Sequence, residues 1–156
     1  MTTWDAFGDE LGRVFRGITD RVYLIIAADA DPTRYVQFAG QASRLDAEAP
    51  GRDVVSDSDE SVLRTSGWAE PTAEQPNWAF SLRLPALTAE YAALAERSVT
   101  ALREAYGVSS PDDLAYRAWR EPELIPPGET WSPQQIADVD PGADSVDFPT
   151  LGISSD

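Results

Sequence analysis

The chain has 156 residues, enough for one domain, and a formal net charge of -15 from 27 acidic and 12 basic side chains, every base being arginine. It contains no cysteine and no histidine, which excludes disulfides, thiolate metal sites and the usual general base. The charge disfavours nucleic acid and anionic membranes, and no signal-like segment or apolar run of about 18 residues occurs, so we expect a cytoplasmic protein.

Residues 4 to 18 are predicted to form an amphipathic helix. Thr3 is its candidate N-cap. Gly8, Gly12 and Gly17 each weaken a helix by up to about 1 kcal/mol relative to alanine, so we expect packing against a sheet to stabilise it. Its apolar side chains recur at spacings of three and four residues: Trp4, Phe7, Leu11, Val14, Phe15 and Ile18.

Residues 21 to 42 are predicted to form two strands at the centre of a sheet, joined by a turn at residues 29 to 33. A third strand at residues 43 to 49 is predicted to be an edge strand. The first strand is apolar on both faces, so each face needs a helix, a second sheet or a partner over it. Its alternating sets are Val22, Leu24 and Ile26 on one face and Tyr23, Ile25 and Ala27 on the other.

Residues 50 to 120 predict a short helix, a strand, a long helix and a further strand. The short helix covers residues 59 to 66 and ends at Gly67, the strand covers 77 to 84, and the long helix covers 88 to 106 and ends at Gly107. Residues 110 to 118 carry both a helix-start signal and a strand alternation, so we expect one helical turn that continues as a strand. The predicted fold class is α+β, a central antiparallel sheet flanked by an N-terminal helix and a long C-terminal helix.

A domain boundary is predicted after Arg120, separating residues 1–120 from residues 121–156. The second part has eight acids, no base and six of the 12 prolines, a composition typical of an extended arm. Ser132, followed by Pro133 and Gln135, predicts a short capped helix. Because the arm also carries large apolar side chains, we expect it to dock through Trp131, either on the sheet around Tyr23, Ile25 and Tyr35 or on a second copy.

The order of these elements resembles the TY-Chap domains, which are peptide-binding chaperone-like domains related to the YbjN proteins and to class I type III secretion chaperones. The resemblance covers about residues 3 to 120. It implies a non-catalytic bacterial α+β domain that holds peptides or other proteins, with a homodimer as one arrangement, and the acidic arm has no counterpart in it. The features that carry it are the Trp4, Phe7, Leu11 start, the RVYLII and RYVQF strands, Gly67 and Trp68 followed by Pro71, Asn77 and Trp78, and GVSSP at residues 107 to 111.

The candidate binding residues are aromatic and aliphatic side chains that a partner segment would cover. Tryptophans 68, 78 and 119 are typical of core or loop anchors, but tryptophan and tyrosine also give large contact area at low entropy cost. Our predicted partner-binding set is Tyr23, Ile25, Tyr35, Phe38, Trp68, Trp78 and Trp131.

No catalytic or metal-binding residues and no cofactor are predicted. Three acidic groups resemble ligand sets, but turn and helix-start roles explain the first two. In the third, Pro141 and Gly142 fall where a calcium loop needs a ligand and its spacer, and no glutamate closes the loop. Two alternatives remain open: an acidic inhibitor that imitates nucleic acid and occupies a basic protein, and a small enzyme that uses only Asp and Arg. The groups are Asp29 with Asp31, Asp57 with Asp59 and Glu60, and Asp138 with Asp140 and Asp144.

Overall fold

A computed structural model describes residues 2–156 and shows an α+β fold with one six-stranded sheet, in the order β4-β3-β2-β1-β5-β6. Neighbouring strands are antiparallel except β5 and β6, which are parallel. The strands are β1 (Val22–Ala28), β2 (Tyr35–Gly40), β3 (Arg44–Ala49), β4 (Trp78–Arg83), β5 (Leu114–Arg120) and β6 (Ser154–Ser155). The helices are α1 (Trp4–Val14), α2 (Glu60–Thr65), α3 (Thr88–Thr100), which continues as the π-helix η2 (Ala101–Ala105), and α4 (Pro133–Ala137). Short 3₁₀ turns are η1 (Phe15–Gly17), η3 (Pro111–Asp113) and η4 (Pro149–Leu151).

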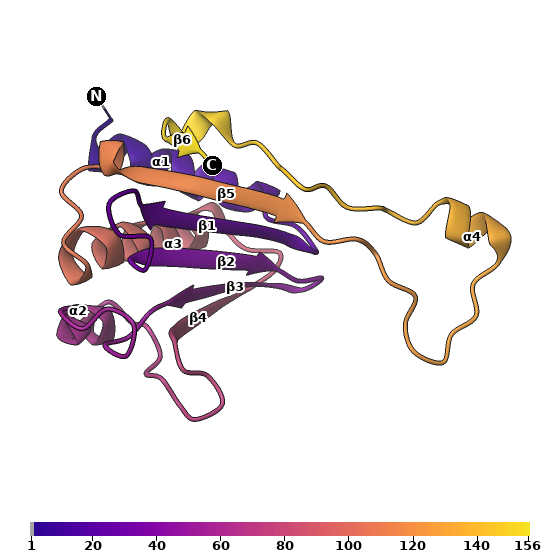
Figure 1. Cartoon of the computed structure of the whole chain (residues 1–156), viewed down its shortest axis with the longest axis horizontal. Helices are drawn as coiled ribbons and strands as arrows, with labels where there is room; N and C mark the ends of the chain where they lie inside the picture. The colour runs from indigo at the N-terminus through magenta and orange to yellow at the C-terminus, as the bar shows by residue number, and fades with distance from the viewer. Residues whose placement is uncertain (1) are drawn as a thin grey trace.

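Helices α1 and α3 lie side by side behind the sheet (Figure 1). The predicted N-cap of α1 is confirmed, since the Thr3 hydroxyl accepts the N–H of Ala6 at 3.1 Å. The apolar stripe of α1 faces the sheet, where Phe7 and Leu11 are fully buried. The helix therefore depends on packing, as its glycine content predicts.

Strand β1 occupies the centre of the core. Leu24 lies opposite Phe38 on β2 and Ala118 on β5, and all three side chains are buried on the helix-covered face. The helical turn and following strand predicted for residues 110 to 118 are confirmed as η3 and β5. The central position of β1 follows from its pairing with β2 on one side and β5 on the other.

The prediction that the third strand is an edge strand is wrong. Strand β3 is interior, with β2 on one side and β4 on the other. Its alternating polar residues, Asp46 and Glu48, face the front of the sheet rather than an unpaired edge. In this sheet β4 and β6 are the outer strands.

Residues 121–142, here called the excursion, leave the end of β5 and project away from the sheet, with α4 near their far end (Figure 1). The predicted cap of α4 is confirmed, because Ser132 and Gln135 bond each other's backbone N–H groups. Three large apolar side chains of the excursion are exposed: Leu124, Ile125 and Ile136.

Residues 143–156, here called the tail, return to the body and dock beside β5. Leu151 is 1% exposed and belongs to the core, and the tail's other apolar side chains, Val146, Phe148 and Ile153, pack against it. The chain therefore docks its C-terminal part on itself. The docking uses these residues instead of Trp131, because Trp131 lies in the excursion, where its indole N–H bonds the nearby Glu129.

An ion-pair cluster centred on Asp140 fixes the base of the excursion. Arg120 donates two hydrogen bonds to its carboxylate, at 2.7 and 2.9 Å, and Arg21 donates one at 3.1 Å. The Gly142 N–H adds a bond at 3.0 Å. The Arg120 bonds, followed by the Gly142 bond, hold the pKa of Asp140 well below its usual value.

We expect the Asp140 cluster to give a pH-dependent contribution to stability. A lowered folded-state pKa means that the contribution is complete above the unfolded-state pKa of about 3.9 and is lost as the pH falls through the folded-state pKa. The difference in melting temperature between wild type and Asp140→Asn should thus be constant near neutrality and shrink below about pH 4. A difference that grew on acidification would contradict this.

Candidate functional site

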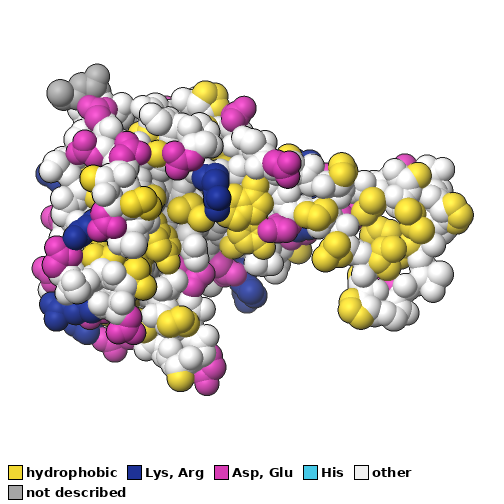
Figure 2. Space-filling model, in the orientation of Figure 1, with side chains coloured by type: hydrophobic (Ala, Val, Ile, Leu, Met, Phe, Trp, Pro, Cys, Tyr) yellow, Lys and Arg dark blue, Asp and Glu magenta, His cyan; other side chains and the backbone are white. Residues whose placement is uncertain are grey.

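The front face of the sheet is the candidate site. Within residues 2–156 the long helices cover only the back of the sheet, and Figure 1 shows the strands uncovered in front. Side chains there are half-buried, in contrast to their fully buried neighbours along β1 and β2. Hydrophobic side chains gather over this face (Figure 2). We call it the open face, and its central members are Tyr23, Ile25, Tyr35, Arg117 and Trp119.

A stacked aromatic pair dominates the open face. The rings of Tyr23 on β1 and Trp119 on β5 are 5.3 Å apart and within 8° of parallel, because the two residues are direct cross-strand neighbours. The Arg117 guanidinium lies 4.8 Å from the centre of the Trp119 ring. Beside the pair is a shallow pocket of about 180 Å³ that includes Ile25 and Gln37. The surface around the two rings is thus largely apolar, with the Arg117 guanidinium against Trp119 and polar side chains on the far side of the pocket.

Carboxylates border this surface on β3. Glu48 accepts a hydrogen bond from the Gln37 amide at 2.9 Å, and Asp46 accepts bonds from Arg44 at 2.9 and 3.0 Å. Burial raises the pKa of the Tyr35 hydroxyl, which therefore stays protonated and can donate a hydrogen bond. The border offers mainly acceptors, which suit N–H groups and basic side chains.

The structure brings together only part of the predicted partner-binding set. Tyr23, Ile25 and Tyr35 lie on the open face of neighbouring strands. The remaining predicted members lie elsewhere: Phe38, Trp68 and Trp78 are at most 3% exposed, and Trp131 is in the excursion. The three buried rings cannot give contact area to a partner in this conformation, so they are not part of the site proposed below.

Arg117 and the pairing of Trp119 with Tyr23 were missed by the sequence reasoning. The alternation of Leu114, Tyr116 and Ala118 places the odd-numbered residues of this segment on the opposite face. The sequence therefore contains the signal that Arg117 and Trp119 share a face. What the sequence could not supply was the β1–β5 register, because it joins residues almost 100 positions apart.

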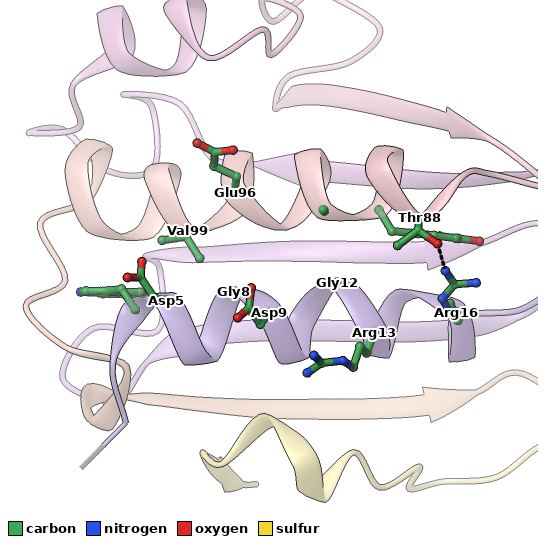
Figure 3. Close-up of a pocket in the computed structure, with 12 residues that line it drawn as sticks. Asp5, Gly8, Asp9, Gly12, Arg13, Arg16, Thr88, Glu96 and Val99 are labelled. Carbon is green, nitrogen blue, oxygen red and sulfur yellow. Dashed lines mark hydrogen bonds between the residues drawn. The ribbon is translucent and has the colours of Figure 1, made fainter.

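A second concavity lies between α1 and α3 on the outer side of the helix layer (Figure 3). It has a volume of about 620 Å³. Gly8 and Gly12 contribute to its wall, Asp5 and Val99 lie at one end, and Arg16 bonds the Thr88 hydroxyl at the other. Charges of both signs line it. The apolar strand residues left without cover are on the open face, so the open face is the stronger candidate.

The acidic groups have structural roles. Asp31 accepts bonds from Thr33, which lower its pKa, and Asp59 caps α2. Arg34 donates to Asp57 at 2.8 Å. Across residues 2–156 no cluster of three or more acidic side chains is arranged to hold a metal ion.

No helix in the described part of the chain is both long and apolar enough to pass through a bilayer.

Comparison with known proteins identifies one family. The model that matches residues 1–120 is that of TY-Chap3, described as T3SS (YopN, CesT) and YbjN peptide-binding chaperone 3. No curated protein and no solved structure matches the chain. The match ends where β5 ends, so the excursion and the tail lie outside it.

Proposed function

The chain belongs to the TY-Chap3 family of peptide-binding chaperone domains, and we propose that its open face holds a segment of a partner protein. The segment would lie across β1 and β5, over Tyr23, Ile25 and Trp119. The function is non-catalytic and needs no cofactor. The partner is another protein or a peptide rather than nucleic acid or a membrane, because the net charge of -15 repels phosphate-rich surfaces.

The observation that supports this proposal is that β1 is apolar on both faces while helices cover only one. Half-buried Tyr23, Ile25 and Ala27 alternate with the fully buried Leu24 and Ile26. An antiparallel sheet that faces water normally carries polar side chains on that face. A partner that covered these residues would remove apolar surface from water.

The surroundings of the face favour a partner segment of mixed chemistry. Trp119 and Tyr23 offer flat surface for an apolar side chain, and tryptophan and tyrosine are enriched among residues that dominate binding energy. Glu48 at the border would attract a basic side chain, because its own partners are uncharged amides, whereas Asp46 is already paired with Arg44. We therefore expect a segment in which large apolar residues are flanked by arginine or lysine.

Peptide selection tests this proposal. Random-sequence peptides displayed on phage would be selected on the full-length protein, and the dissociation constants of the recovered peptides would be measured for Trp119→Ser. We expect at least about tenfold weaker binding, because the substitution removes one of the two stacked rings. Melting temperatures of both proteins would show that the variant is folded.

The control is Val54→Ser, which removes a large apolar side chain that is 49% exposed and belongs to the loop between β3 and α2 rather than to a strand of the sheet. It should bind the selected peptides as wild type does. Selected peptides that bind Trp119→Ser with unchanged affinity would place the peptide site elsewhere. Peptides rich in basic but not apolar residues would instead favour an acidic inhibitor of basic proteins.

A further inference from the structure

We propose that the outer edge of β5 is a second peptide-binding site, separate from the open face, and that the chain's own tail occupies it as a displaceable internal ligand. The ligand class is an extended peptide with large apolar side chains. The tail would then be autoinhibitory, since a partner could use this edge only after the tail leaves.

The tail sits on β5 as a bound peptide would. Strand β6 pairs in parallel with Ala115 and Tyr116, and the Asp156 N–H bonds the Tyr116 carbonyl at 2.9 Å. Nearer the excursion, the Val146 N–H bonds the Ala118 carbonyl at 2.9 Å. Added strands of this kind gain affinity from main-chain bonds and specificity from side-chain pockets.

The tail's side chains pack in a space between β5 and the end of α1, here called the seat. Phe148 packs against Tyr116, with ring centres 6.4 Å apart, and its backbone N–H bonds the Tyr116 hydroxyl at 2.9 Å. A side chain at Gly17 would begin 3.2 Å from the Phe148 ring, so glycine leaves the space that the ring uses. Leu151, in η4, is buried against α1. The seat thus accepts an aromatic residue and a leucine.

Three features make the tail a displaceable occupant. The family match ends at residue 120, which is the last residue of β5, so the tail lies outside the matched part of the chain. The excursion, an exposed connection of residues 121–142, separates the tail from β5. The tail also brings acids and no base to a protein that already has a net charge of -15.

The tail also pairs with only part of β5, so a competing peptide could form more main-chain hydrogen bonds with this strand than the tail does. Strand β5 runs from Leu114 to Arg120, but the tail's ladder covers Ala115 and Tyr116, with one further bridge from Ala143 to Arg120. A straight peptide could pair along more of the strand. To displace the tail, such a peptide must compete with a segment whose covalent connection gives it an effective concentration of about millimolar order.

The test uses the full-length chain and a labelled synthetic peptide of the tail, residues 143–156. Leu151→Asp should release the tail, because it places a carboxylate in a buried apolar seat. The peptide should then bind this variant at least about tenfold more tightly than wild type, whose edge is free in only a small fraction of molecules. The matched control is Leu124→Asp, the same change at a residue 77% exposed, which should behave as wild type.

A peptide that itself carries Asp in place of Leu151 should bind neither protein. Loss of the cooperative thermal transition in Leu151→Asp, with Leu124→Asp intact, would overturn the proposal, since the tail would then be an indispensable part of the core. A folded Leu151→Asp protein that binds the peptide no better than wild type would overturn it as well. Neither result depends on whether peptides bind the open face.

Discussion

Replacement of Leu24 by alanine is expected to lower the free energy of unfolding by about 2–5 kcal/mol. Leu24 is fully buried in the middle of β1, between Phe38 and Ala118 on the neighbouring strands. The substitution removes apolar contacts and leaves a cavity that the paired strands on both sides cannot collapse into. Denaturant unfolding followed by tryptophan fluorescence would measure the change.

The adjacent residue gives the control for this prediction. Ile25 is on the same strand but faces the open side, so Ile25→Ala should cost roughly 1 kcal/mol, a typical value for a single substitution. Comparable losses at the two positions would mean that the open face is covered in solution. An unchanged stability in Leu24→Ala would contradict the central position of β1.

The face to which each side chain of a strand points could be predicted from the sequence because it is a local property. The alternation in residues 22–28 separates inward from outward side chains, and in residues 114–120 it does so except at Ala115, which is also buried. Strand order is not local. The apolar residues Leu45, Ala47 and Ala49 on one side of the third strand led to the prediction of an edge strand, but alternation reports which face is exposed and carries no information on which strand pairs next.

The candidate site was predictable in part for the same reason. Tyr23, Ile25 and Tyr35 alternate with core residues, so their common face followed from the pattern. Trp78 shares a face with Leu82, and both are buried, so residue type was a poorer guide than spacing. Trp68 is in a loop without periodicity, and its burial depends on contacts that no local signal describes.

The sequence was sufficient to predict that the C-terminal part docks, but not which of its residues dock or where. Its apolar content required some surface to cover it, and the tail is indeed covered. Trp131 was the expected anchor because of its size. The structure instead uses Phe148 and Leu151, because β5 ends beside the start of the excursion and the return path leads along its free edge.

Replacement of Gly40 by alanine should be the second strongly destabilising change, at about 3 kcal/mol, the upper part of the usual range for overpacking. A Cβ atom at Gly40 would lie 1.9 Å from the Thr19 carbonyl oxygen and 2.9 Å from that of Ile18. Both obstacles are backbone atoms. The clash can be relieved only if β2 or the segment before β1 moves, which would disturb the bond from the Arg21 N–H to the Gly40 carbonyl.

The same substitution at Gly8 should stabilise the protein instead of destabilising it, because the two glycines differ in what surrounds them. Gly8 is inside α1, and a Cβ atom there would meet only Val99, at an ordinary contact distance of 3.5 Å. Alanine is favoured over glycine in a helix interior by up to about 1 kcal/mol, so Gly8→Ala should raise the unfolding free energy. Thermal and denaturant unfolding of the two variants would measure the contrast. A Gly40→Ala protein as stable as Gly8→Ala would show that residues 18–19 do not approach β2 as closely as described.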